Sequence, residues 1–155
     1  MHAFAEASAG RRLRLGGVDI DYPQGLAGHS DADVVVHAIA DAILGAARLE
    51  DIGHHFPDSD PAYSGIDSLI LLSEVRDKIA ALGYQVLDID CVIMAERPRL
   101  AGYRDAMREA MAQALGLDRQ SIGIKATTHE GLGAIGRGEG IAATAVALLQ
   151  TKDID

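Results

Sequence analysis

The spacing of apolar residues changes several times along this 155-residue chain, and it constrains the fold more than any other feature. Three segments place apolar residues every three to four positions, the period of an amphipathic helix: residues 31–49, 67–82 and 103–115. Four other segments alternate or stay apolar between turn residues, as strands do: residues 13–22, 84–94, 121–126 and 141–149. This mixture predicts an α/β or α+β two-layer fold, in which a mixed β-sheet carries helices on its outer face.

Glycines set several of the expected element ends. Gly16 and Gly17 lie at the centre of residues 13–22, which predicts a β-hairpin with a tight turn. Gly83 and Gly116 follow the second and third helical segments, where a glycine commonly ends a helix. These positions divide the chain into a hairpin, two helices, a strand, a third helix and two final strands.

The segments between these elements carry polar and turn-forming residues. Ser30 or Asp31 is expected to N-cap the first helix, because a side-chain oxygen there can accept from the free N–H groups of its first turn. Residues 51–65 contain two prolines and several Asp and Ser residues, and residues 127–140 are rich in glycine. Both segments are predicted to be long loops, which often carry function in compact domains.

The composition indicates a single domain, residues 1–155, with 48% hydrophobic residues and enough length for a core. The single cysteine, Cys91, excludes an intrachain disulfide, and its apolar neighbours predict a buried side chain rather than a nucleophile. Together with the lack of a signal-peptide pattern, this points to the cytoplasm. Apolar runs fall far short of the ~20 residues of a membrane helix, so no membrane association is expected.

The net charge of -9 argues against nucleic acid as a partner, because such a surface needs clustered Lys and Arg. An anionic substrate would also be repelled by the overall field of this protein. Helix N-termini, local cations or bound metal would have to attract it. Residues that could bind a metal ion are therefore the first candidates for a functional site.

Two histidines near the first helix are candidates for such a site. His37 lies four residues from Asp33 and from Asp41, so a carboxylate one turn away could hold its ring and leave the other nitrogen for a metal. His29 precedes the helix, where the helix dipole favours an anion. On spacing alone, ordinary surface and loop histidines explain the same pattern.

The segment after the strand at residues 121–126 places two hydroxyls, an imidazole and a carboxylate within four positions. Glu130 could hold Mg²⁺, while Thr127 or Thr128 donates to phosphate oxygens. The alternative interpretation is that this glycine-rich segment is only a flexible connector without a binding role. His54 and His55 are less suited to a metal, because adjacent residues rarely converge on one ion.

Several separated blocks together resemble the 2-C-methyl-D-erythritol 2,4-cyclodiphosphate synthase family: residues 2–4, 26–37, 51–53, 56–58, 125–128 and 136–140. The resemblance covers nearly the whole chain. It implies a homotrimer with sheets around its axis and active sites at subunit interfaces. It also implies the reaction, in which the 2-phosphate of 4-diphosphocytidyl-2-C-methyl-D-erythritol 2-phosphate attacks the β-phosphate, closes a cyclic diphosphate and expels CMP in the non-mevalonate isoprenoid pathway.

The resemblance further implies roles for individual residues. His2 and His37 would hold Zn²⁺ or a similar ion, Glu130 would hold Mg²⁺ or Mn²⁺, and Asp41 would stand behind His37. His29 and Thr128 would stabilise the transition state. Other positions match those that contact the cytidine diphosphate substrate: His2, Ser30, Asp51, Ile52, Gly53, Phe56, Pro57, Asp58, Ser59, Asp60, Ala95, Glu96, Arg97, Pro98, Arg99, Leu100, Ala101, Thr127, His129, Glu130, Ala134 and Arg137.

The chain departs from the family pattern at a few positions. The first metal motif of the family is Asp-x-His, and Met1 stands at x. The expected carboxylate and most of the family's first strand would therefore precede the chain, so that the first strand is expected to be truncated. We expect a late start site or a trimmed chain, with a true loss as the alternative. Arg99 stands where the family commonly has lysine, which keeps the positive charge but changes the geometry of a contact with phosphate. His129 and Ala134 replace a common threonine and a common aromatic residue.

Two other functions compete with an active synthase. One is a catalytically impaired trimer of the same fold that binds isoprenoid phosphates along its axis. The other is an unrelated zinc hydrolase, for which the usual His-Glu-x-x-His spacing is missing from the sequence.

Overall fold

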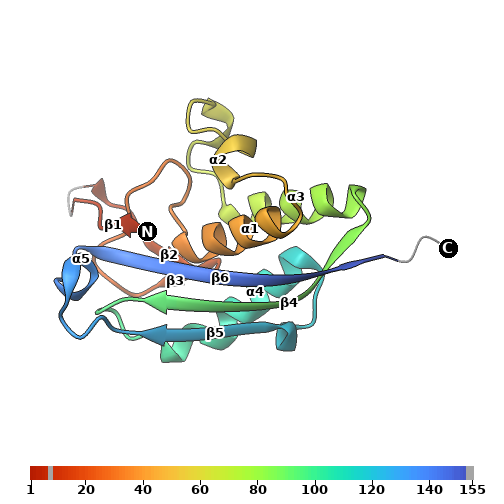
Figure 1. Cartoon of the computed structure of the whole chain (residues 1–155). Coiled ribbons are helices and arrows are strands. Elements are labelled where there is room, and N and C mark those ends of the chain that lie inside the picture. Colours follow the sequence, from red (N-terminus) through yellow and green to blue (C-terminus); the bar gives the residue numbers. More distant parts are fainter. Residues whose placement is uncertain (7–8, 153–155) are drawn as a thin grey trace.

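A mixed four-stranded sheet packs against three long helices in the computed structural model, which describes residues 1–6 and 9–152 (Figure 1). The strand order is β1 (His2–Ala3), β6 (Gly140–Thr151), β4 (Tyr84–Met94) and β5 (Ile122–Thr127). β4 is parallel to β5 and antiparallel to β6, so Ile89 pairs with Ile122 on one side and Ala147 on the other. The predicted α+β fold with a mixed sheet is confirmed.

The three predicted helices are present as α1 (Val34–Ala46), α3 (Ser68–Ala81) and α4 (Arg104–Leu115). Gly116 ends α4 with a left-handed φ of 69°, which a glycine adopts without strain, and so confirms the predicted end. The C-cap residue of α3 is Leu82, and the predicted glycine, Gly83, follows it with a left-handed φ of 79°.

The start of α1 differs from the expectation. Asp33 caps the helix, and its carboxylate accepts hydrogen bonds from the backbone N–H groups of Val35 at 3.1 Å and Val36 at 3.0 Å. The prediction of Ser30 or Asp31 was wrong because the backbone N–H groups that their side-chain oxygens bind near α1 are those of Ala32 and Asp33, which precede the first turn of the helix.

The predicted hairpin is confirmed as β2 (Leu13–Leu15) and β3 (Val18–Ile20), paired antiparallel around the two glycines. The spacing of apolar residues did not predict the strand β1, because two residues are too few for an alternating pattern, whereas the family resemblance implied a truncated first strand. The segments predicted as loops contain single turns of helix: α2 (Ile52–His55), η2 (Pro61–Tyr63) and α5 (Gly133–Gly136). Further 3₁₀ turns precede α4 and β5: η3 (Ala101–Tyr103) and η4 (Arg119–Ser121).

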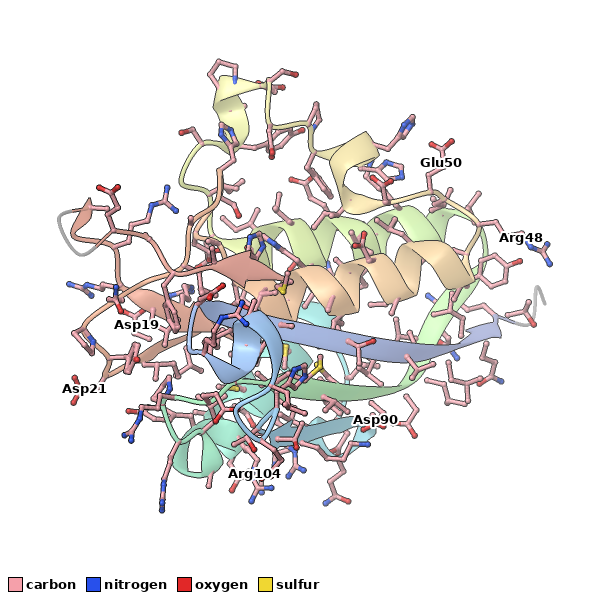
Figure 2. The ribbon with its side chains drawn as sticks, turned by 60° about the vertical axis from the view of Figure 1, so that its left-hand side comes forward. Asp19, Asp21, Arg48, Glu50, Asp90 and Arg104 are labelled. Carbon is pink, nitrogen blue, oxygen red and sulfur yellow. The ribbon has the colours of Figure 1, made fainter. Side chains whose placement is uncertain are left out.

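One face of the sheet carries the core. The inward side chains of β4, such as Val86, Ile89 and Ile93, join apolar side chains of α1, α3 and α4 in one buried cluster. Cys91 is fully buried in it, and burial raises the pKa of its thiol to about 12. Asp33 is a charged residue buried beside this core, whereas Arg48, Glu50 and Asp90, labelled in Figure 2, are exposed.

The opposite face of the sheet exposes apolar side chains in the single chain. Val146 and Leu148 of β6 are 69% and 55% exposed, and Leu87 of β4 is 46% exposed. Figure 1 shows β6, β4 and β5 side by side, with these strands forming a broad surface. None of the described helices is long and apolar enough to cross a lipid bilayer.

Candidate active site

A cavity of about 490 Å³ lies between β1, the loop before α1, the N-terminal half of α1 and α2. Many residues selected from the sequence line it: His2, His29, Ser30, His37, Asp41, Ile52, Gly53, Phe56 and Asp58. Segments that are distant along the chain therefore meet at one place. The cavity combines imidazoles, carboxylates and hydroxyls, which are groups that bind cations and phosphates.

Two histidines meet inside this cavity. Nε2 of His2 lies 3.2 Å from Nδ1 of His37, and the two rings are nearly perpendicular, at 69°. Burial and the neighbouring His37 lower the pKa of His2 to about 4, and burial also lowers the pKa of His37. Both rings are therefore neutral at pH 7, which is the form that binds metal ions.

The far nitrogen of His37 is hydrogen-bonded within the protein. Nε2 lies 2.9 Å from Oγ of Ser68 and 3.1 Å from Oγ of Ser30. The carboxylate of Asp41, expected from the sequence to stand behind this ring, instead accepts a hydrogen bond of 2.8 Å from the backbone N–H of Ile52. Helical spacing could not predict the contact with Ser68, because such spacing identifies neighbours only on the same helix and Ser68 comes from α3.

Other predicted residues line this cavity or lie near its lining residues in the sequence. His29 places Nε2 3.3 Å from the carbonyl oxygen of Asp60, and Asp60 itself caps η2 through the N–H of Ala62. Asp51 caps α2 by accepting from the N–H of His54 at 2.9 Å. Asp58 has an exposed carboxylate that lines the cavity. Pro57 and Ser59 are exposed beside it.

A second hollow, of about 260 Å³, lies where β4 and β5 end side by side. It is lined by Ala95, Glu96, Pro98, Arg99, Leu100, Ala101, Ala126, Thr127 and Thr128. Parallel strands bring their carboxyl ends to the same edge, which explains why two segments some 30 residues apart form one surface. The structure thus joins the predicted residues 95–101 with Thr127 and Thr128.

Glu96 supports the loop that follows β5. Its Oε1 accepts hydrogen bonds from the backbone N–H groups of His129 at 2.8 Å and Gly131 at 3.3 Å. Between them, Glu130 is exposed and has a left-handed φ of 52°, and its carboxylate accepts from Oγ1 of Thr128 at 3.2 Å. Glu96 therefore fixes the conformation that presents Glu130 and Thr128 to solvent.

A third hollow, of about 290 Å³, contains Arg97 and Arg137 together with Phe4 and Tyr22. The guanidinium of Arg137 pairs with the carboxylate of Glu139. Ala134 lies half-buried on α5 nearby in the sequence and lines none of these three hollows. In one chain, the predicted site residues are therefore divided among separate hollows.

The His2–His37 pair fits a tetrahedral metal ion. Two nitrogens at 2.0–2.1 Å from such an ion would be roughly 3.3 Å apart, close to the observed 3.2 Å. Among residues 1–6 and 9–152, no three His, Cys, Asp or Glu side chains converge as a metal site requires. Any further ligands would thus have to join the two imidazoles from elsewhere.

Sequence reasoning overlooked two residues of this region. Ser68 is fully buried and bonds to His37, while Tyr63 lines the cavity and packs edge-on against Phe56. Ser68 follows the capping residue Asp67, so its only sequence signal was its place at the start of a helix. No local pattern connects it with a histidine 31 residues earlier.

Comparison with known proteins gives consistent results. A model of the YgbB family matches residues 1–150. The 2-C-methyl-D-erythritol 2,4-cyclodiphosphate synthase of Moorella thermoacetica is 58% identical over 144 residues, which cover 93% of this chain and 88% of that protein. The synthase of Rubrobacter xylanophilus is 53% identical over 150 residues, covering 97% and 90%.

Solved structures agree with the sequence relatives. The bifunctional IspDF from Campylobacter jejuni superimposes with a TM-score of 0.92 at 43% identity, covering 98% of this chain and 40% of that chain. The CDP complex of IspF from Plasmodium falciparum gives a TM-score of 0.84 at 32% identity, covering 98% and 92%.

Proposed function

The chain belongs to the YgbB family, and from this premise we propose how its residues share the work of a 2-C-methyl-D-erythritol 2,4-cyclodiphosphate synthase. The reaction is a cyclising lyase reaction that converts 4-diphosphocytidyl-2-C-methyl-D-erythritol 2-phosphate into the cyclic diphosphate and releases CMP. An attack between two phosphates of one molecule depends on positioning and charge neutralisation more than on a protein nucleophile. A non-catalytic trimer of the same fold is not favoured, because relatives of 53–58% identity are synthases.

The proposed metal ligands are His2 and His37, and the observation that carries this proposal is the 3.2 Å spacing of their neutral ring nitrogens. A Zn²⁺-type ion held there would neutralise charge on the β-phosphate. The exposed carboxylate of Glu130 would hold Mg²⁺ or Mn²⁺, since a hard cation prefers oxygen ligands and the Thr128 hydroxyl already orients this group.

The two main hollows would bind different parts of the substrate. We assign the methylerythritol phosphate to the cavity lined by His29, Ser30 and Asp58. Carboxylates there would accept from the substrate hydroxyls, and His29 would face the phosphates. The cytidine diphosphate moiety is assigned to the hollow between residues 95–101 and Thr127. The CDP complex of the Plasmodium falciparum relative supports a cytidine diphosphate ligand. Thr128 would donate to the diphosphate as charge develops.

A homotrimer is the proposed assembly. Its formation would bury the apolar face of Leu87, Val146 and Leu148, which would otherwise meet water. It would also let the first hollow of one subunit face the second hollow of its neighbour, so that one substrate could contact both. We further propose that the trimer can bind an isoprenoid phosphate along its axis and that the protein is located in the cytoplasm.

Zinc content and CMP release together test the metal assignment. The His37→Gln variant should lose its bound zinc and reduce CMP release at least about 100-fold. His54→Gln, in which an exposed histidine outside the cavity is changed, should match the unmodified protein in both measurements. Unchanged zinc content in His37→Gln would show that this histidine is not a ligand.

A further inference from the structure

A buried chain of hydrogen bonds begins on the far side of His37. Oγ of Ser68 lies 2.9 Å from Nε2 of His37, and the hydroxyl of Ser68 donates to a carboxylate oxygen of Asp31. Ser68 is completely buried, so water does not compete for these contacts. The three side chains come from α1, α3 and the loop before α1.

The direction of these bonds determines which ring nitrogen of His37 carries the proton. A carboxylate only accepts hydrogen bonds, so the single proton of the Ser68 hydroxyl is committed to Asp31. Ser68 can then only accept from His37, which places the ring proton on Nε2. Nδ1 is left with a free lone pair, and this is the atom that lies 3.2 Å from Nε2 of His2.

Ser30 alone would not impose this choice. Its Oγ lies 3.1 Å from the same Nε2, and it accepts from the N–H of Ala32. Its own proton is free to be donated to Nε2, in which case His37 would carry its proton on Nδ1. The commitment of Ser68 to Asp31 is therefore what selects one tautomer.

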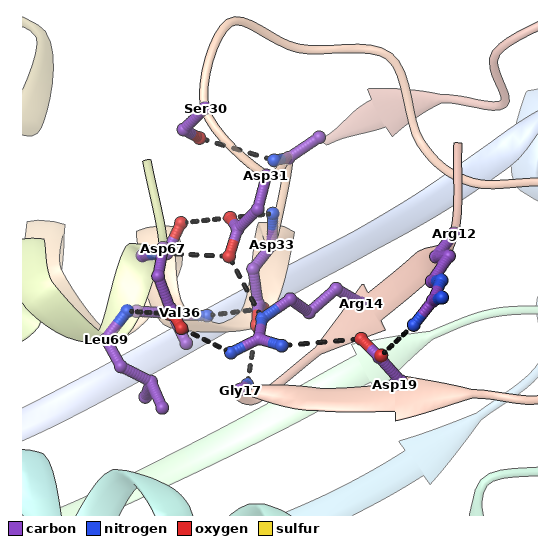
Figure 3. Close-up of polar contacts among 12 residues, drawn as sticks. Arg12, Arg14, Gly17, Asp19, Ser30, Asp31, Asp33, Val36, Asp67 and Leu69 are labelled. Atoms are coloured by element: carbon purple, nitrogen blue, oxygen red, sulfur yellow. Dashed lines mark hydrogen bonds and ion pairs between the residues drawn. The ribbon is translucent and has the colours of Figure 1, made fainter. Parts of the chain in front are cut away.

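Asp31 is in turn fixed by Arg14 of β2. Nε of Arg14 lies 3.1 Å from the Asp31 carboxylate, while its terminal nitrogens pair with Asp67 at 2.6 Å and Asp19 at 3.3 Å (Figure 3). Asp31 also accepts from the backbone N–H groups of Ser68 at 3.0 Å and Asp33 at 3.1 Å. A cation and two N–H donors hold this carboxylate in the orientation in which it accepts from Ser68.

We propose that Ser68, oriented by Asp31 and Arg14, is a positioning residue that holds His37 in the Nε2–H tautomer and so keeps Nδ1 ready for a metal ion. The proposal rests on the assignment of His37 as a metal ligand and adds the residues that prepare it. Partners of this kind typically change metal affinity by roughly 10- to 100-fold.

The test reads the tautomer directly in metal-free protein. Histidine-selective ¹⁵N labelling and long-range ¹H–¹⁵N spectra at pH 8 distinguish protonated from unprotonated ring nitrogens, and a His37→Gln spectrum assigns the signals. The unmodified protein should show only the Nε2–H form at His37. Ser68→Ala and Asp31→Ala should each show a mixture, because each frees Nε2 to accept from a hydroxyl.

A matched control and a second measurement complete the test. Ser73→Ala changes another serine of α3, whose hydroxyl bonds only to backbone carbonyls of Leu69 and Ala114, and should keep the tautomer. Zinc competition titrations should give a dissociation constant raised about tenfold or more in Ser68→Ala and Asp31→Ala. An unchanged tautomer in both variants would overturn the proposal, whereas retention of zinc by His37→Gln would overturn the ligand assignment instead.

Discussion

The carboxylate of Asp33 accepts a hydrogen bond of 2.6 Å from the backbone N–H of Gly17, and this bond joins the turn of the β2–β3 hairpin to the start of α1 (Figure 3). The other oxygen accepts from the N–H groups of Gly16, Val35 and Val36. One buried side chain thus holds the hairpin that carries Arg14 against the helix that carries His37. The geometry of the cavity that contains His2 and His37 depends on this connection.

Asp33→Asn should lower the free energy of unfolding by about 2–3 kcal/mol. Burial raises the pKa of Asp33 to about 6, so the group is still mainly ionised at pH 7 and all four N–H donors meet a carboxylate. In the variant, the amide NH₂ would face one of those donors. Urea unfolding at fixed protein concentration measures this free energy. The control is Asp118→Asn, because Asp118 is an exposed cap of η4; this substitution should change the free energy of unfolding by less than about 0.5 kcal/mol. Equal effects of the two substitutions would contradict this role.

Val146→Asp should convert the proposed trimer to monomers. The 69% exposed valine lies on the uncovered sheet face, and burying an unpaired carboxylate at an interface is strongly unfavourable. Sedimentation velocity gives the molecular mass. Ile70→Asp, at a 52% exposed apolar residue of α3, is expected to leave the mass unchanged. A trimeric Val146→Asp protein would place the interface elsewhere.

Glu96→Ala should lower kcat/KM for CMP release by roughly 10- to 100-fold, because the loop carrying Thr128 and Glu130 would lose its support. Glu96→Gln should keep most of the activity, since its amide oxygen can take the place of Oε1. Glu109→Ala, on the surface of α4, serves as the control. If Glu96→Gln is as impaired as Glu96→Ala, the charge of Glu96 acts on the substrate directly.

Cys91 should resist alkylation in the folded protein. Burial raises the pKa of the thiol to about 12, so at pH 8.5 the folded protein contains almost no thiolate, and the side chain is fully buried. Iodoacetamide should label it only after unfolding in urea, as mass spectrometry would show. Rapid labelling of the folded protein would contradict the observed burial.

Local patterns in the sequence were sufficient for the main elements. The helical spacing of residues 67–82 and the glycine at position 116 correspond to α3 and to the end of α4, because both depend on interactions within a few residues. Strand β4 occupies residues 84–94, as predicted. The cap of α1 was misplaced, because Asp33 is chosen by its simultaneous bonds to Gly16 and Gly17, which lie in another element.

By itself, the sequence determined the α+β fold class, the type and order of the longer elements, and, through the resemblance of its separated blocks, the family. The tertiary structure decided which atoms meet. His2 and His37 are 35 residues apart along the chain and 3.2 Å apart in space, and Ser68 rather than Asp41 bonds to the far nitrogen of His37. Such contacts depend on how α1 and α3 pack, and hydrophobic periodicity specifies which face of a helix is buried but not the partner it meets there.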